Sequence, residues 1–463
     1  MSLAPQTAAL QRLTAQQAWH YRALPLQFDG TRLRLAVAPG GGGEAAEELA
    51  ILTGLEIELL EVAEGELQPA LASHYRRDER SRPPAASAAG FLEGLFEEAV
   101  AMRASDIHLE PQRDSARVRL RVDGRLLERF ELALEEYPRY VNQIKVRAGL
   151  DISQRMLPQD GRVRLAGEGA GGGGLDVRVS TLPTLYGEKV VMRLLGRSAV
   201  ELDLGQLGMT GDQLRDFRLG THAETGIIVV SGPTGSGKTT TLYAALNELN
   251  DVGVNITTLE DPIEYTLPGV NQVQTNPAVG FTFELALSTF MRQDPNIIML
   301  GEIRDAASAQ VATRASLTGH LVLATLHTNS AIGIVPRLVD MGIPAYKLAD
   351  TLNTLVAQRL LRRLCDRCKR VDPAAPATPF AAGSELFTAD GCPACHYTGY
   401  RGRVAAHEVI RVDADLRDAI RAGAVGKGYA QDAAGSLAAR ARDLVVAGVT
   451  SWREAAPLLA EEQ

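Results

Sequence analysis

The sequence predicts an α/β protein in which a large domain, built on a parallel β-sheet, follows two smaller α+β domains. In the last part of the chain, apolar runs alternate with helical segments, as in a buried parallel sheet with helices on both faces; the runs are residues 226–231, 296–300 and 321–326. A glycine-rich phosphate-binding motif stands between the first run and the helix after it. The length of 463 residues also exceeds that of one ordinary domain.

Composition narrows the classes of function. Hydrophobic residues make up 45% and charged residues 22%, close to the globular average, which excludes global disorder and collagen-like repeats. A formal net charge of −8 disfavours nucleic acid as a partner, although a local basic patch remains open. No run reaches the roughly 18 apolar residues of a membrane span, and MSLAPQTAALQRL does not resemble a signal peptide. We therefore expect a cytoplasmic chain.

Residues 1–75 are expected to form the first small domain. Apolar residues alternate on both sides of Asp29-Gly30, a two-residue turn signal that predicts a β-hairpin. A helix over residues 44–53, a strand over 56–62 and a helix over 65–75 complete the expected α+β module. Residues 76–90 are rich in charge, Pro, Ala and Ser and are expected to be a linker. The glycine run 40–43 has no phosphate-site context and predicts a surface loop.

Residues 91–196 are expected to form the second small domain. It begins with a helix whose apolar residues recur at helical spacing: Phe91, Leu92, Leu95, Phe96 and Val100. Strands over residues 116–122 and 125–131 flank Asp123-Gly124, a second hairpin signal. Another strand pair is expected over 175–181 and 188–195, and the glycine run 171–174 predicts a loop. The third domain, residues 200–463, carries most of the chemistry.

A phosphate-binding loop is the most specific motif in the chain. The pattern G-x-x-x-x-G-K-[ST] is met directly after the strand 226–231 and before a helical segment, in the order that such a loop requires. Its residues are Gly232, Pro233, Thr234, Gly235, Ser236, Gly237, Lys238, Thr239 and Thr240. We expect the backbone N–H groups to surround ATP phosphates, Lys238 to contact the β- and γ-phosphates, and Thr239 to place its hydroxyl on Mg²⁺. The alternative is a chance match in a tight turn.

Acidic residues follow two of the predicted strands. Glu302 comes after the apolar run 297–300, where an ATPase needs a carboxylate at the end of a neighbouring buried strand. A second acidic group, Glu260, Asp261 and Glu264, surrounds Pro262, which ends its strand. These three carboxylates are candidates for binding Mg²⁺ or orienting the attacking water. Unpaired surface acids are the alternative.

Two histidines, His320 and His327, bracket the strand 321–326. Seven steps along a strand place them on opposite faces near opposite ends, so a shared metal site is not expected. One of them could hydrogen-bond the γ-phosphate, and satisfied core histidines are an equal alternative.

All four cysteines lie within residues 365–395, in two C-x-x-C pairs: Cys365 with Cys368, and Cys392 with Cys395. Two such pairs predict a structural zinc site with four thiolate ligands, and the alternative is two disulfides. Basic residues surround the first pair, forming either a patch for an anionic partner or a solvated face; they are Arg359, Arg362, Arg363, Arg367, Lys369 and Arg370.

Several motifs in fixed order make a resemblance specific. The stretches GPTGSGKTTT, TTLEDPIEYTLPGVNQVQTN, TFMRQDPNIIMLGEIRD and ASLTGHLVLATLHTNSA resemble the Walker A, Asp box, Walker B and His box of the secretion ATPases of the type II secretion and type IV pilus superfamily. ASDIHLEP, QRMLPQDGR and STLPTLYGEKVVMRLL resemble the second N-terminal domain of that family. The resemblance covers residues 91–463 strongly and residues 1–75 loosely.

The resemblance implies a RecA-like P-loop core, with ATP and Mg²⁺ as ligands and a hexameric ring as the assembly. It makes Glu264 and Glu302 the two candidates for the catalytic glutamate and places His320 and His327 on His-box positions. Arg178 and Arg193 match arginines that reach a nucleotide from the domain above the P-loop, often in the neighbouring subunit. Asn296 departs from the family, whose members often carry an acid there.

The resemblance also implies a function. We expect a cytoplasmic ATPase that powers protein export through a type II secretion system and is recruited to the inner membrane. Residues 1–75 are expected to dock on the cytoplasmic domain of a membrane partner, or alternatively to be a stability cap. A type IV pilus extension ATPase is the runner-up, and the Cys₄ zinc element occurs in both classes. A nucleic-acid translocating motor and a scaffold that binds ATP without turnover are less favoured.

Overall fold

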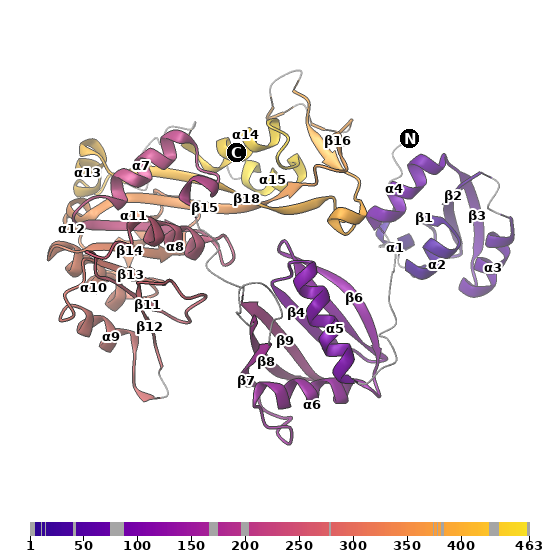
Figure 1. Ribbon diagram of the computed structural model, residues 1–463. Coiled ribbons are helices and arrows are strands. Elements are labelled where there is room, and N and C mark those ends of the chain that lie inside the picture. Colours follow the sequence, from indigo (N-terminus) through magenta and orange to yellow (C-terminus); the bar gives the residue numbers. More distant parts are fainter. Residues whose placement is uncertain are drawn as a thin grey trace.

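The structure is a computed structural model that describes residues 5–10, 12–13, 15–39, 43–74, 88–165, 175–195, 203–276, 279–373, 375–376, 378–380, 384–425 and 435–460. Three larger β-sheets follow one another along the described chain, each with its own helices (Figure 1). Most of the predicted linker, together with the glycine run 171–174 and residues 40–42, lies outside the described residues. Among the described helices, none is long and apolar enough to cross a membrane.

The first unit has a three-stranded sheet in the order β1-β2-β3. Its elements are α1 (Thr7–Leu10), α2 (Ala15–His20), β1 (Ala23–Phe28), β2 (Arg32–Val37), α3 (Gly43–Thr53), β3 (Glu56–Glu61) and α4 (Glu64–His74). The predicted hairpin is confirmed: β1 pairs antiparallel with β2, and Asp29 Oδ1 accepts hydrogen bonds from the backbone N–H groups of Thr31 and Arg32. Gly43, expected in a loop, is the first residue of α3.

The second unit is a six-stranded antiparallel sheet in the order β6-β5-β4-β9-β8-β7. Its elements are α5 (Ala88–Ala101), β4 (Asp106–Pro111), β5 (Ser115–Val122), β6 (Arg125–Ala133), α6 (Tyr137–Ala148), β7 (Gln159–Leu165), β8 (Leu175–Thr184) and β9 (Gly187–Leu195). Helices α5 and α6 share one hydrophobic core with the sheet, on the face they cover in Figure 1. The second predicted hairpin is also confirmed, since Asp123 (φ 47°) and Gly124 (φ 86°) both adopt the positive φ that its tight turn requires.

The third unit has a seven-stranded sheet in the order β12-β11-β13-β14-β10-β15-β18. These strands are β10 (Gly226–Ser231), β11 (Ile256–Glu260), β12 (Asn271–Gln274), β13 (Ile297–Leu300), β14 (Leu321–Leu326), β15 (Leu352–Leu364) and β18 (Tyr400–Arg411). Six of them are parallel, as predicted, but β18 runs antiparallel to β15 at the edge. The chain leaves β15, forms the cysteine element and returns directly as β18, and this return reverses the direction.

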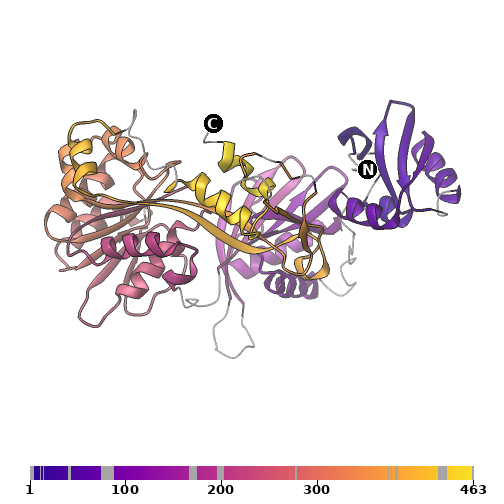
Figure 2. The same ribbon diagram turned by 90° about the horizontal axis from the view of Figure 1, so that it is seen from above.

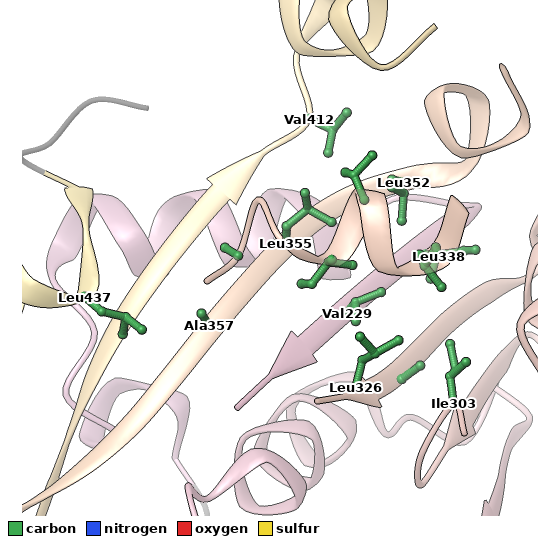
Figure 3. Close-up of a cluster of buried hydrophobic side chains, with 14 of the residues drawn as sticks. Val229, Ile303, Leu326, Leu338, Leu352, Leu355, Ala357, Val412 and Leu437 are labelled. Carbon is green, nitrogen blue, oxygen red and sulfur yellow. The ribbon is translucent and has the colours of Figure 1, made fainter. Parts of the chain in front are cut away.

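Helices cover both faces of this sheet, as the alternation predicted. On β10, Ile227 and Val229 belong to one core, and Ile228 and Val230 belong to another. The first core contains residues of α9 (Phe283–Phe290), α10 (Ala306–Leu317), α11 (Ile334–Asp340), α12 (Ala345–Thr351), α13 (Ala414–Arg421), α14 (Leu437–Val446) and α15 (Trp452–Ala460). The second contains residues of η1 (Leu204–Gln206), α7 (Gly211–Thr221) and α8 (Lys238–Leu249). Figure 3 shows the first core, where Val229 and Leu326 lie near Leu338 of α11.

The cysteine element is small and lies beyond the sheet. It contains β16 (Lys369–Val371), β17 (Phe387–Ala389) and η3 (Pro393–Cys395), and β16 pairs with β17. Strands β15 and β18 extend from the sheet to this element, and both views show them reaching over towards the second unit (Figures 1 and 2). One continuous strand, β15, therefore connects the centre of the sheet to the cysteine element.

Candidate functional site

The glycine-rich loop joins β10 to α8 at the carboxyl edge of the parallel sheet. Gly235 (φ 79°) and Gly237 (φ 88°) are left-handed, which favours glycine. At Gly232, a Cβ atom would lie 2.5 Å from the carbonyl oxygen of Gln358, so the neighbouring strand β15 also excludes a side chain there. This backbone shape leaves the N-terminus of α8 open to an anion.

Lys238 is the first residue of α8 and is buried. Its Nζ donates to the carbonyl oxygens of Gly232 (2.8 Å) and Pro233 (3.1 Å). Burial lowers the pKa of Lys238, while the negative charge of Glu302 opposes that change. Ser236 Oγ is buried and has no hydrogen-bond partner within the described part of the chain. A loop with a mobile cation and an unsatisfied buried hydroxyl fits a nucleotide phosphate chain.

The structure places Glu302 just beyond β13, beside the loop that follows β14. His327 Nε2 lies 3.0 Å from Glu302 Oε1. Arg304 Nε donates to Glu302 Oε2 (2.8 Å), and Arg304 Nη1 lies 3.2 Å from Asp261 Oδ2. Arg304 therefore links the Walker B stretch to the Asp box. Sequence reasoning missed it, although the GEIRD stretch places this arginine two residues after the glutamate.

The three acidic residues around Pro262 do not act as one group. Glu260 is buried and accepts hydrogen bonds from Tyr243, Thr258 Oγ1 (2.6 Å) and Gln272 Nε2 (3.2 Å). Burial raises the pKa of Glu260, and these donors oppose it. The interpretation of Glu260 as a ligand of Mg²⁺ is therefore wrong, because its lone pairs are used inside the core.

The other two carboxylates stand apart from Glu260. Asp261 pairs with Arg304. Glu264 is half-buried, and its carboxylate makes no hydrogen bond with any residue that the structure describes. The pKa of Arg178 is lowered by burial of its guanidinium, and the negative charge of Glu264 is the largest influence against that shift. Glu264 therefore retains a free carboxylate at the edge of the site.

Arg178 and Arg193 are direct cross-strand neighbours on β8 and β9. Arg178 Nη2 donates to the carbonyl oxygen of Ile263 (2.9 Å), so it reaches the Asp box of its own chain. Arg193 is 58% exposed and its Nε lies 3.1 Å from Asp106 Oδ1. Both belong to a row at one register across five strands: Arg121, Asp106, Arg193, Arg178 and Arg162. The sequence did not indicate this row, because residues of strands distant in the chain form it.

The two histidines occupy opposite ends of β14, as predicted. His320 precedes the strand, and its Nδ1 lies 2.9 Å from the carbonyl oxygen of Ala315 at the end of α10. Six residues of strand separate it from His327, a distance of roughly 20 Å. The structure brings His327 to Glu302 and leaves His320 at the far edge of the sheet, away from the phosphate-binding loop.

Gln358 is a further residue of the site that sequence reasoning missed. It lies on β15, and its Oε1 accepts a hydrogen bond from Thr241 Oγ1 (2.8 Å), just after the phosphate-binding loop. It is buried, and its carbonyl oxygen is the atom that faces Gly232. The register between β10 and β15 creates this contact, and no local motif reports it.

The four cysteines come together with their Sγ atoms within 4.8 Å of one another. Cys365 and Cys392, Cys368 and Cys395, and Cys392 and Cys395 each have Sγ atoms 3.8 Å apart. A tetrahedron with zinc–sulfur bonds of about 2.3 Å has edges of about 3.8 Å. The four thiols therefore fit a tetrahedral zinc ion and are too far apart for disulfides, whose sulfur atoms lie about 2.05 Å apart.

Three of the six basic residues near the cysteines pair with an acidic side chain of their own chain: Arg362, Arg363 and Arg370. Arg362 is buried and bonds Glu454, and its guanidinium lies over the ring of Tyr400. Arg370 pairs with Asp390. These contacts neutralise part of the patch and favour the alternative of a solvated face.

Comparison with known proteins identifies the family of this chain. The family described as "Type II/IV secretion system protein" matches residues 85–457, and the MshEN domain matches residues 2–81. Type II secretion system protein E of Dickeya dadantii (strain 3937) is 46% identical over 378 residues, which cover 80% of this chain and 75% of that protein. Type IV pilus assembly ATPase PilB of Myxococcus xanthus (strain DK1622) is 38% identical over 447 residues, which cover 89% of this chain and 78% of PilB.

Solved structures support the α/β fold prediction. The Legionella pneumophila ATPase DotB superposes with a TM-score of 0.62 at 20% identity, covering 82% of this chain and 98% of DotB. The pilus retraction motor PilT with bound ADP superposes with a TM-score of 0.52 at 25% identity, covering 78% of this chain and 94% of PilT.

Proposed function

Because the chain belongs to the family of type II/IV secretion system proteins, we propose that it is an ATPase that drives protein export through a type II secretion system. The observation that carries this proposal is the sheet edge where Lys238, Glu302 and His327 meet beside an open helix N-terminus. These groups suit in-line attack of water on a γ-phosphate, a reaction that depends on positioning and on charge stabilisation.

The loop residues have separate roles in this proposal. Backbone N–H groups of residues 234–238 bind phosphate oxygens, and Lys238 exchanges its two carbonyl partners for oxygens of the β- and γ-phosphates. Thr239 would hold Mg²⁺, which neutralises charge on the phosphates when it is bound. Arg178 supplies a fixed positive charge from the second unit as the γ-phosphate leaves.

We assign the general base to Glu264 rather than to Glu302. The Glu302 carboxylate already accepts a hydrogen bond from Arg304 and lies against His327. These contacts suit a residue that organises the part of the site next to the γ-phosphate. Within the described residues the Glu264 carboxylate has no hydrogen-bond donor, so it is ready to accept a proton from water.

Phosphate release measured for Glu264→Gln and Glu302→Gln tests this assignment. Glu264→Gln should lower kcat by about a hundredfold or more while ATP binding is retained, because general-base catalysis contributes on that scale. Wild-type turnover by folded Glu264→Gln protein would reject Glu264 as the base, and absence of turnover in the wild-type protein would reject the ATPase proposal itself.

Zinc and partner proteins complete the proposal. Cys365, Cys368, Cys392 and Cys395 would hold Zn²⁺ as a structural ion, with all four ligands from the protein.

We propose a hexameric ring in the cytoplasm, recruited to the inner membrane through residues 1–75 and the cytoplasmic domain of a platform partner. Exposed apolar side chains at one end of the second unit support self-association; they are Ile152, Met156, Leu157, Leu182, Leu185 and Tyr186.

Type IV pilus extension is the second candidate. The observation behind it is the match to PilB, which is 38% identical to this chain and covers 89% of it. Deletion of the gene would separate the two, because loss of a secreted protein with intact pili supports secretion, and loss of pili with intact secretion supports pilus assembly.

A further inference from the structure

Among the residues that the structure describes, hydrogen bonds join the second unit to the ATPase core at two separate places. At the first, Arg178 of β8 donates to Ile263 in the Asp box (2.9 Å). At the second, the carboxylate of Asp123, in the turn between β5 and β6, accepts a hydrogen bond from the backbone N–H of Gly402 (2.8 Å). Arg403 Nε lies 4.0 Å from Asp123 Oδ1, which adds a positive charge to this second contact.

The residues that contact Asp123 come directly after the cysteine element in the chain. Cys365 N–H donates to the carbonyl oxygen of Gly399, and Leu364 pairs with Tyr400 where β18 begins. The turn and this loop enclose a small cavity, lined on one side by the end of α5 and by Asp123, and on the other by Cys395, His396 and residues 400–402. The docking segment, residues 399–403, comprises Gly399 and the start of β18 and is therefore fixed beside the thiol cluster by backbone pairing.

The turn is built to present a carboxylate. Asp123 and Gly124 both have positive φ, and Arg121 Nη1 donates to the carbonyl oxygen of Gly124 (3.0 Å). Aspartate tolerates this backbone conformation better than most residues do. Only 20% of the Asp123 side chain is exposed, so the hydrogen bond to Gly402 is shielded from solvent.

We propose that Asp123 is a positioning residue whose hydrogen bond to Gly402 seats the second unit on the cysteine element and so keeps Arg178 at the Asp box. This inference rests on the proposed ATPase function. Strands β5 and β8 are three strand positions apart in one sheet, so the two contacts are separated by about 15 Å or more. One contact alone lets a rigid sheet pivot, whereas two separated contacts fix its orientation.

Strands β15 and β18 connect the contact at Asp123 to the nucleotide site. β15 leaves the phosphate-binding loop at Gln358 and reaches Cys365 seven residues later, and β18 returns beside it from Gly402. The zinc ion would affect ATP hydrolysis without touching the nucleotide, because it would stabilise the segment that contacts Asp123.

Asp123→Gly tests the proposal in the full-length protein, because glycine keeps the positive φ of the turn and removes the carboxylate. We expect kcat for ATP hydrolysis to fall about tenfold, the weight of one hydrogen bond to a charged group, with KM unchanged because the phosphate-binding loop is untouched. Asp123→Asn, which keeps an oxygen acceptor and tolerates the turn, should restore most of kcat. Asp114→Gly, in the exposed turn at the other end of β5, is the matched control and should behave as wild type.

Two further measurements separate positioning from general loosening. In an Arg178→Ala background, Asp123→Gly should lower kcat by less than twofold, because Asp123 acts through Arg178. Hydrogen exchange should show faster exchange of the Gly402 amide in Asp123→Gly and unchanged exchange in α8. An unchanged Gly402 amide, an unchanged kcat, or an equal additional loss in the Arg178→Ala background would overturn the proposal. If the wild-type protein has no ATPase activity, the proposed function fails, and the exchange measurement still decides whether Asp123 docks the second unit.

Discussion

At the scale of the residue, Lys238 makes the sharpest prediction. Its ammonium group rests on two carbonyl oxygens of its own loop, so it stays close to where the phosphates would bind. Lys238→Ala should reduce ATP turnover by more than about a hundredfold, because the substitution removes a charge that stabilises the transition state. Phosphate release is the measurement, with circular dichroism as the control for folding. Normal turnover in a folded variant would contradict the assignment of the loop.

His407 gives a prediction about pH. It is fully buried on β18, neither ring nitrogen has a hydrogen-bond partner within the described chain, and burial, with help from the charge of Arg440, lowers its pKa to about 4. Unfolded histidine titrates near pH 6.5, so between pH 6.5 and 4 the unfolded chain binds a proton that the folded chain does not. The free energy of unfolding should therefore fall as the pH drops through this range.

The contribution of His407 is about 2 kcal/mol at pH 5 relative to pH 7.5. Urea unfolding at the two pH values measures it, and in His407→Leu the difference between them should be smaller by about that amount. An equal pH dependence in the variant would show that carboxylates account for all of it.

The residues that the sequence predicted well are those that belong to contiguous motifs. The loop that leads to Lys238 follows β10, and Glu302 follows β13; the parallel sheet brings the carboxyl ends of these two apolar strands to one edge. Arg304 and Gln358 were missed because their roles depend on pairing between distant segments. Glu260 was misread because a strand-end carboxylate looks the same in sequence whether it faces a ligand or a buried tyrosine.

At the scale of the element, the cysteine element should depend on zinc. Metal analysis should find one zinc ion per chain in protein purified without chelator, since structural zinc sites bind with roughly 10–16 kcal/mol of apparent free energy in small domains. Cys395→Ser should speed hydrogen exchange in residues 365–395 and leave exchange in α8 unchanged. Protein that contains no zinc, or an element that keeps its protection after the substitution, would refute the site.

Among the elements, tight hairpins and buried strands were predictable, and the antiparallel direction of β18 was not. Asp and Gly are residue types that adopt positive φ, so the turn at Asp123 and Gly124 could be predicted from the local sequence. Helix α5 begins at Ala88, three residues before its predicted start, because alanines that looked like linker also favour helix. The antiparallel edge strand β18 follows from the compact cysteine element, whose two ends lie side by side.

At the scale of the whole molecule, a mixing experiment tests whether the arginines of the second unit act within a subunit or between subunits. Arg178 contacts the Asp box of its own chain, and Arg193 is more than half exposed and held by Asp106. If Arg193 reaches a neighbour's nucleotide, mixing Arg193→Ala with Lys238→Ala protein should restore part of the ATPase activity, because some interfaces regain both groups. Activity per subunit should also rise with protein concentration. No recovery despite proven co-assembly would place the action of Arg193 within one chain.

Deletion of residues 1–75 tests the docking role of the first unit. This unit has its own hydrophobic core and a separate sheet, so the rest of the chain should fold without it. Basal ATP hydrolysis should stay within about twofold of wild type, whereas membrane recruitment and secretion in cells should be lost. A truncated protein that unfolds would support the alternative of a stability cap, and one that still secretes would reject docking.

The interior position of β10, between β14 and β15, also determines the order in which the protein can form during synthesis. Ser231, at the end of β10, donates to the carbonyl oxygen of Val356 on β15, 125 residues further along the chain. At a synthesis rate of about 5–20 residues per second, β10 waits roughly 6–25 seconds for that neighbour. The first two units end at Leu195, before β10 is made, so all of their strands are available before then. One edge of the nascent strand β10 therefore stays unpaired for this interval, and a ribosome pause between residues 231 and 356 should increase the demand for chaperones.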